Sequence, residues 1–181
     1  MNAPIRHRLA IITLMAGILS GLAAVYALAE NEPDLERQRW PARWITHPTA
    51  PQRDYAVLFF RHAWQLKELP ASFRIHVSAD PRYRLLLNGR EVSMGPARGD
   101  VMNWRYETVA LAPWLQTGTN VLAAEVWNPG GFAPWAEHSQ RTGFIVQGAE
   151  AASQVVNTGT QWQVLQSTAH CPYPEPFRLD S

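Results

Sequence analysis

Hydrophobic and polar residues alternate in several short stretches of this chain, most clearly in residues 72–79. The apolar side of that stretch consists of Phe73, Ile75, Val77 and Ala79. A period of two residues is typical of a half-buried antiparallel strand. We therefore predict a strand here, with His76 on its polar side and exposed to solvent.

The next stretch, residues 80–93, predicts a β-hairpin. Asn88 and Gly89 separate two partly apolar runs, and a type I′ turn needs positive φ at both central residues. A two-residue loop fixes the opposing pairs as Leu87–Arg90, Leu85–Val92 and Tyr83–Met94. The predicted buried side consists of Tyr83, Leu85, Leu87, Val92 and Met94. The opposite side is mostly polar and consists of Arg84, Leu86, Glu91 and Ser93.

Further strands are predicted along the chain from their aromatic and β-branched content and their alternation. They cover residues 56–64, 104–111, 121–127, 144–147, 154–156 and 161–166. In 104–111 the residues on one side are Trp104, Tyr106, Thr108 and Ala110. In 121–127 and 161–166 the inward residues are Leu122, Ala124, Val126, Trp162 and Val164. About seven or eight short strands with closely spaced turns predict an antiparallel β-sandwich.

The first 29 residues differ from the rest. Arg6 and Arg8 precede an uncharged apolar run, which ends in Ala27-Leu28-Ala29. Such a pattern predicts a secretory signal peptide, with an uncleaved membrane anchor as the alternative. We expect an exported protein, periplasmic or extracellular, divided into a signal peptide (1–29), an extended lead-in (30–54), a β-sandwich (55–167) and a Pro-rich tail or linker (168–181).

The composition and charge of the chain limit the kinds of partner that it can be expected to bind. The chain is 46% hydrophobic and 17% charged, as expected for a globular domain with a core. Loss of Arg6 and Arg8 would leave 14 basic and 15 acidic residues, a net charge of −1, which argues against nucleic acid. Cys171 is the only cysteine, so no internal disulfide forms. A membrane partner is expected only if the signal sequence is retained.

A series of motifs makes the chain resemble the N-terminal β-sandwich domain of bacterial α-L-rhamnosidases, a jelly roll of the galactose-binding kind. The motifs include Trp44-Ile45, Phe60-Arg61, Ser78-Ala79-Asp80, Arg82-Tyr83, Asn88-Gly89, Gly95-Pro96-Ala97-Arg98, Trp104, Tyr106, Asn120-Val121, Val126-Trp127-Asn128, Arg141-Thr142-Gly143-Phe144 and Trp162. Their order covers nearly the whole chain after the signal sequence.

The resemblance implies a module of a rhamnosidase-like glycoside hydrolase rather than its catalytic part. In that family, acidic residues of a large (α/α)₆ barrel hydrolyse the substrate, and nothing in this chain matches the barrel. The resemblance therefore favours a non-catalytic, carbohydrate-binding accessory module, from a truncated or split product. Its expected partner is a rhamnose-containing glycan or a rhamnosidase catalytic domain.

Sugar recognition needs a flat aromatic surface and planar polar side chains. The loop 95–103, the residues after it and the loop 128–142 supply them, and 8 Trp residues are many for this length. The candidate glycan-binding residues are Arg98, Asp100, Trp104, Trp127, Asn128, Trp135 and Glu137. Trp135, in a Pro- and Gly-rich loop, is the candidate that we expect to be most exposed.

Three alternatives stay open. Trp127 and Trp135 would instead form a docking face for a catalytic domain if no sugar binds. Glu137-His138 beside Asp100 or Glu107 would serve an independent glycosidase only as a carboxylate pair about 5–5.5 Å or about 6.5–9.5 Å apart. A structural Ca²⁺ would need oxygens that Asp80, Asp100 and Asn103 offer only from scattered positions. No cofactor is predicted, and no His/Cys spacing favours zinc.

Overall fold

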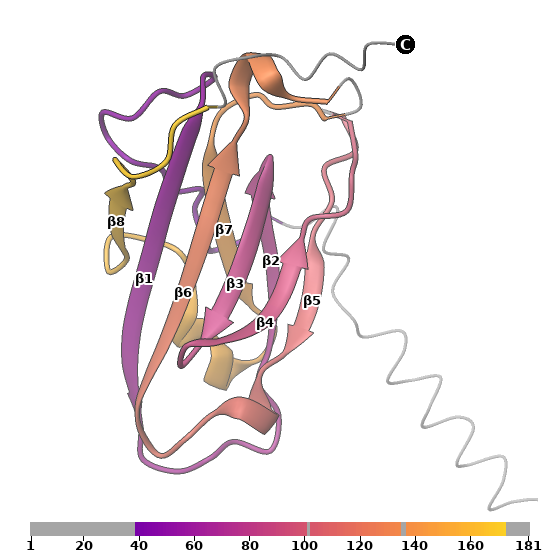
Figure 1. Ribbon diagram of the computed structural model, residues 1–181. Coiled ribbons are helices and arrows are strands. Elements are labelled where there is room, and N and C mark those ends of the chain that lie inside the picture. Colours follow the sequence, from indigo (N-terminus) through magenta and orange to yellow (C-terminus); the bar gives the residue numbers. More distant parts are fainter. Residues whose placement is uncertain (1–38, 101, 135–136, 173–181) are drawn as a thin grey trace, which may run out of the picture. The chain divides into compact units, whose positions relative to one another are not determined.

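The computed structural model describes residues 39–100, 102–134 and 137–172. These residues form an antiparallel β structure with two sheets packed face to face (Figure 1). The strands are β1 (Ala56–Leu66), β2 (Arg74–Asp80), β3 (Arg82–Leu87), β4 (Arg90–Gly95), β5 (Glu107–Ala110), β6 (Gly118–Asn128), β7 (Gly143–Gly148) and β8 (Gln163–Gln166). The larger sheet has the order β4-β3-β6-β1-β8 and the smaller one β5-β2-β7. The two-sheet β prediction is confirmed.

Short 3₁₀ helices complete the described structure. They are η1 (Ala112–Trp114), η2 (Gly130–Phe132) and η3 (Ala151–Val156). The predicted strand at 154–156 is therefore wrong, because that segment forms the end of η3. The predicted strand at 104–111 begins only at Glu107. No helix among the described residues is long and apolar enough to cross a membrane.

One core lies between the sheets. Phe60 of β1 stacks on Phe144 of β7, with ring centroids 5.2 Å apart, so the contact joins the two sheets. The inward residues predicted for β6 (Leu122, Ala124 and Val126) are all buried. Burial of such side chains contributes about 1.5–3 kcal/mol each, which makes this alternation the main determinant of the fold.

The predicted apolar side of β2 is confirmed, since Phe73, Ile75, Val77 and Ala79 are fully buried. The prediction for His76 was wrong. Its side chain is buried beneath the rings of Trp40 and Tyr106, and a ring nitrogen lies 2.9 Å from Thr108 Oγ1. The lead-in and the segment before β5 cover this outer side of β2, which the alternation of β2 alone cannot reveal.

The hairpin turn is present as predicted. Asn88 and Gly89 have φ values of 52° and 82°, and Leu87 pairs with Arg90. The Asn88 side chain also accepts a hydrogen bond from the Val121 backbone N–H at 2.8 Å. The turn is thereby attached to β6 as well as to its own strands.

Of the three predicted pairs, Leu87–Arg90 is observed, and the pairs Leu85–Val92 and Tyr83–Met94 are wrong. A β-bulge between Leu85 and Leu86 sets Leu85 opposite Ser93 and Tyr83 opposite Gly95. Met94 is consequently 54% exposed instead of buried. An extra residue in one strand reverses the sides of all residues beyond it.

The lead-in lies along β7, the edge strand of the smaller sheet. Ile45 forms a bridge with Phe144, and the Ala42 N–H donates to Gln147 Oε1 at 2.9 Å. The Arg43 N–H donates to the carbonyl of Thr158 at 3.0 Å. These contacts cover the edge of β7 and bring Trp44 to the end of the sheet where β2 finishes.

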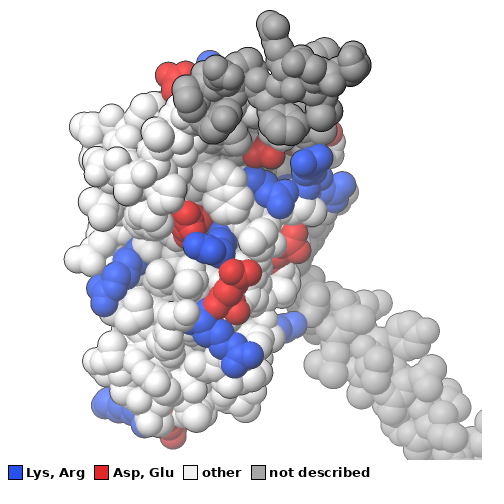
Figure 2. Space-filling model, viewed as in Figure 1, with Lys and Arg blue, Asp and Glu red and all other residues white. Residues whose placement is uncertain are grey.

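Charges of both signs are interspersed on the face of the molecule that Figure 2 shows. Arg84 of β3 and Glu125 of β6 form an ion pair of 2.6 Å on the outer surface of the larger sheet. The face carries no extended basic surface of the kind that binds a nucleic acid backbone.

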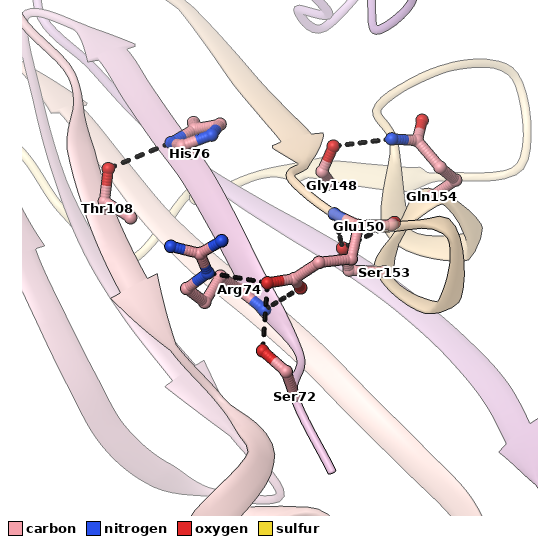
Figure 3. A network of polar contacts seen from close by, with 8 residues as sticks. All are labelled: Ser72, Arg74, His76, Thr108, Gly148, Glu150, Ser153 and Gln154. Atoms are coloured by element: carbon pink, nitrogen blue, oxygen red, sulfur yellow. Dashed lines mark hydrogen bonds and ion pairs between the residues drawn. The ribbon is translucent and has the colours of Figure 1, made fainter. Parts of the chain in front are cut away.

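The beginning of β2 is closed by a polar network around Glu150 (Figure 3). Its carboxylate accepts hydrogen bonds from the Arg74 backbone N–H and Nε, both at 2.6 Å, and from Ser72 Oγ at 2.9 Å. Burial acts to raise the pKa of the Glu150 carboxyl, but these donors together hold the pKa below its ordinary value. The network joins β2 to the start of η3.

Candidate functional site

A cleft of about 400 Å³ lies at the other end of β2. Its walls come from the lead-in, the last residue of β2, the segment before β5 and the segment that enters β7. The lining residues are Trp44, Ile45, Thr46, Asp80, Trp104, Gln140, Arg141, Thr142 and Gly143. We call it the Asp80 cleft. Its volume falls within the range of small-molecule sites.

Asp80 gives this cleft its polar wall. The residue is only 4% exposed, and its Oδ2 accepts the backbone N–H groups of Gln140 and Arg141 at 2.8 and 2.7 Å. Its Oδ1 is buried and has no hydrogen-bond partner among the described residues. An unmatched buried carboxylate oxygen is costly, so it marks a place for a hydrogen-bond donor.

Two tryptophans form the apolar part of the cleft. Trp44 is 49% exposed, and its ring stands nearly perpendicular to that of Trp104, with centroids 6.4 Å apart. Gly143 allows this arrangement, because a Cβ at that position would lie 3.3 Å from the Trp44 ring. Trp104 Nε1 is buried and has no partner within the part of the chain that the structure describes.

A second, much smaller cleft of about 20 Å³ shares Trp104 with the first. Arg98 and Glu137 also line it, so the structure brings three of the predicted glycan-binding residues together. Glu137 Oε1 is buried and, like Asp80 Oδ1, has no partner among the described residues. The two clefts thus lie next to the same residue, Trp104.

Asp100 uses its carboxylate within its own turn. Its Oδ1 accepts the backbone N–H groups of Met102 and Asn103 at 2.8 and 2.9 Å, and the Asn103 amide donates to both carboxylate oxygens. The Asn103 side-chain hydrogen bond, with that of the Met102 backbone, lowers the pKa of Asp100. Asp100 lines neither cleft described above.

Asn128 and Trp127, two further predicted glycan-binding residues, line neither cleft. Asn128 is buried, and its amide donates to Ser139 Oγ and Thr142 Oγ1 while accepting the Gly130 N–H. Its polar atoms thus organise the loop that carries Gln140 and Arg141. Trp127 is half-buried on the side of β6 facing away from the core, paired with Val57 and Arg82. Trp135 lies outside the described residues.

The prediction from sequence missed three residues of the Asp80 cleft: Trp44, Asp80 and Arg141. The sequence analysis names Trp44 only as part of the Trp44-Ile45 motif, and Asp80 as the first residue of the hairpin stretch and a possible Ca²⁺ ligand. The sequence feature that could have indicated the site is the acidic residue Asp80, which directly follows the alternating stretch 72–79. Its meaning depends on the segment 140–143, which lies about 60 residues later in the chain.

No group of three or more His, Cys, Asp or Glu side chains is arranged to hold a metal ion within residues 39–100, 102–134 and 137–172. Asp80 and Asp100, considered above as Ca²⁺ ligands, engage different donors: Asp80 the backbone of 140–141, and Asp100 its own turn. The described site offers hydrogen bonding and aromatic surface.

The described residues thus form a β module with a cleft at one end. No protein-family model and no curated protein matches the sequence. Among solved structures, the chain is similar to a GH78 family rhamnosidase of Bacillus sp. GL1, with a TM-score of 0.63 and 24% identity. It is also similar to an α-L-rhamnosidase from Dictyoglumus thermophilum, with a TM-score of 0.58 and 14% identity.

Each likeness covers 71% of this chain but only 14% and 17%, respectively, of the two rhamnosidase chains. The chain therefore has the fold of one part of these much longer proteins. The resemblance to rhamnosidases expected from the motifs is confirmed at the level of the fold.

Proposed function

We propose that the chain is a non-catalytic accessory module of an α-L-rhamnosidase-like glycoside hydrolase and binds carbohydrate in the Asp80 cleft. One observation carries the proposal: two tryptophans, one of them half-exposed, and the acidic residue Asp80 line the same cleft. Arg98 and Glu137 extend the site through the second cleft. In this proposal the β-sandwich is a jelly roll of the galactose-binding kind.

Aromatic rings and a carboxylate suit a sugar for complementary reasons. A pyranose has an apolar C–H face that packs on an indole ring, and hydroxyl groups that donate to a carboxylate. Hydrogen bonds to a charged acceptor are about twice as strong as neutral ones. The half-exposed Trp44 would supply the packing surface, and Asp80 would fix the orientation of the sugar.

Isothermal titration of the purified protein with L-rhamnose and a panel of rhamnosides tests the proposal. We expect saturable binding that Trp44→Ala weakens at least about 10-fold, because the substitution removes the exposed ring. Trp114→Ala is the matched control, since Trp114 lines neither described cleft. Absence of heat with any glycan would contradict the proposal, and turnover of an aryl rhamnoside would contradict its non-catalytic part.

The second candidate is a docking module for a catalytic domain. Phe59 of β1 and Leu165 of β8 are neighbours in register and are 36% and 64% exposed. Figure 2 shows a mostly uncharged area on the side where β1 and β8 lie in Figure 1. Contiguous exposed apolar surface often marks a protein interface. Phe59→Asp would abolish association with a co-expressed rhamnosidase catalytic domain if this function is correct, and unchanged association would exclude it.

Export to the periplasm or outside the cell belongs to the same proposal. Amino-terminal sequencing of the secreted protein would give Glu30 as the first residue if the predicted signal peptide is removed. Recovery of the intact chain in the membrane fraction would instead favour the uncleaved anchor.

A further inference from the structure

We propose that the second, smaller cleft is a binding site for an oxyanion, such as a carboxylate or sulfate group, which arginine side chains recognise. We call it the Arg98 cleft. Residues of the loop that follows β4, of the segment before β5 and of 137–138 line it. The proposal goes beyond the proposed function and does not depend on it, because it rests on the charges around this cleft.

The Arg98 cleft is lined mainly by positive charge. Three arginines line it: Arg82, Arg98 and Arg105. Glu137 is the one acidic residue among its described lining residues, so three positive charges face one negative charge when His138 is neutral. Figure 2 shows basic side chains gathered at the upper right of this face, where the loop after β4 lies in Figure 1. Like charges gathered on one surface attract an anion.

The three arginines of the Arg98 cleft differ from other arginines of the strands in their pairing. Arg74 forms an ion pair with Glu150 and Arg84 forms one with Glu125, each at 2.6 Å. In the part of the chain that the structure describes, none of the three cleft arginines forms an ion pair. Glu137 does not supply one, and its Oε1 is buried without a hydrogen-bond partner among the described residues. The positive charge of the cleft is therefore not neutralised by direct pairing.

The acidic residues of the neighbouring loop are engaged by the backbone. Glu107 Oε1 accepts the Ala97 N–H at 2.8 Å. The Asp100 carboxylate accepts hydrogen bonds from the turn that it begins, including the Asn103 N–H at 2.9 Å. These contacts hold the loop that carries Arg98 in place. They leave recognition of an external anion to the arginines.

Contacts of two arginines place their side chains at the wall of the cleft. Arg82 Nη1 donates to the carbonyl of Pro96 at 3.1 Å, and Pro96 lines the cleft. A Cβ at Gly99, another lining residue, would lie 3.1 Å from Arg105 Cγ, so the Arg105 side chain runs past Gly99. A guanidinium group carries five N–H donors, so a bond to a carbonyl leaves others for an anion.

The size of the Arg98 cleft limits what it can hold. Its volume of about 20 Å³ has room for about one water-sized group and not for a sugar ring. A carboxylate or sulfate group matches the planar fork of a guanidinium, and such charge-assisted hydrogen bonds are about twice as strong as neutral ones. The carboxylate of an organic ligand and a free inorganic anion share this chemistry, and the experiment separates them.

An NMR titration of the purified protein at constant ionic strength tests the proposal. The probes are sodium sulfate and sodium D-glucuronate, with D-glucose as the neutral counterpart of glucuronate. We expect saturable shifts of the amide signals of Ala97, Gly99 and Arg105 with both anions, and no such shifts with glucose. Tighter binding of glucuronate would support the carboxylate of an organic ligand, and tighter binding of sulfate a free inorganic anion.

Two variants test the role of the arginines. Arg98→Gln and Arg105→Gln should each raise the Kd of the tighter-binding anion at least about 10-fold, the ratio for loss of one hydrogen bond to a charged group. Both side chains are exposed, so the variants should keep the fold, which far-UV circular dichroism checks. Arg61→Gln is the matched control and should bind as the wild type does, because Arg61 is an exposed arginine of β1 that lines neither cleft.

Three results would overturn the proposal. The first is a set of shifts that rise linearly with the anion concentration without saturating. The second is an equal response to glucose and glucuronate, which would show that charge is not recognised. The third is a Kd that Arg61→Gln raises as much as Arg98→Gln does, which would show a general effect of net charge. None of these results bears on the proposed function, whose test uses neutral rhamnosides.

Discussion

A carboxylate lies at each end of β2: Glu150 beside its first residue and Asp80 as its last residue. The two carboxylates differ in their hydrogen bonds. At the Arg74 end, both oxygens of Glu150 are occupied by donors from Ser72 and Arg74. At the Asp80 end, Oδ2 accepts two backbone N–H groups, and Oδ1 is buried without a hydrogen-bond partner among the described residues. The first end is closed and joins elements of the fold. The second end shows the same kind of anchoring beside a cleft, where we propose that a ligand binds.

The same contrast holds for the glycines at the two ends of β7. A Cβ on Gly148, at the Glu150 end, would overlap the carbonyl group of Ser153 and the nitrogen of Gln154. A Cβ on Gly143, at the Asp80 end, would meet only the half-exposed ring of Trp44 and two carbonyl oxygens at ordinary contact distance. Backbone cannot move aside easily, whereas an exposed side chain can.

The largest expected effect follows from this difference. Gly148→Ala should lower the free energy of unfolding by about 3 kcal/mol or more, because η3 must shift away from β7. Gly143→Ala should lower it by about 1 kcal/mol or less, but should weaken glycan binding by displacing Trp44. Urea unfolding of the two variants measures the difference. Equal destabilisation would contradict the view that only one end is tightly packed.

A smaller effect is expected from Glu150→Gln, and it depends on pH. The folded-state pKa of Glu150 lies below its ordinary value of 4.5. Its contacts therefore contribute stability above about pH 4.5, and this contribution is lost as the pH falls through the lower folded-state pKa. Wild type should be more stable than Glu150→Gln at pH 7, and the gap should narrow toward pH 3. A gap that widens in acid would show that the pKa is raised instead.

Trp44→Ala should change stability least. Trp44 is 49% exposed, so its removal should cost about 1 kcal/mol or less in the free energy of unfolding. Thermal unfolding followed by far-UV circular dichroism measures this directly. A loss of several kcal/mol would assign Trp44 to the packing of the lead-in on β7 and would remove it from the ligand site.

Much of the sheet structure follows from the sequence, because it depends on local patterns. The alternation in β2 and β6 and the Asn88–Gly89 turn each predict the observed structure. The bulge beside Leu85 and the burial of His76 do not follow in this way. The bulge interrupts the regular pairing within the hairpin itself, and His76 is covered by Trp40 from the lead-in.

The candidate site was predictable only in part, because the sequence does not show which partners each polar side chain finds in the fold. Arg98, Trp104 and Glu137 do meet at one cleft, as chemically suitable residues in neighbouring loops. Asn128 and Asp100 have equally suitable side chains, but local hydrogen bonds occupy them. Residue type indicates which groups can bind a sugar. Only the hydrogen-bond partners show which groups, such as Asp80 Oδ1, remain unused.

A crystal structure of the protein with methyl α-L-rhamnopyranoside tests the central claim most directly. The account predicts a sugar in the Asp80 cleft, packed against the half-exposed ring of Trp44. A sugar bound on another surface, with the Asp80 cleft empty, would contradict it.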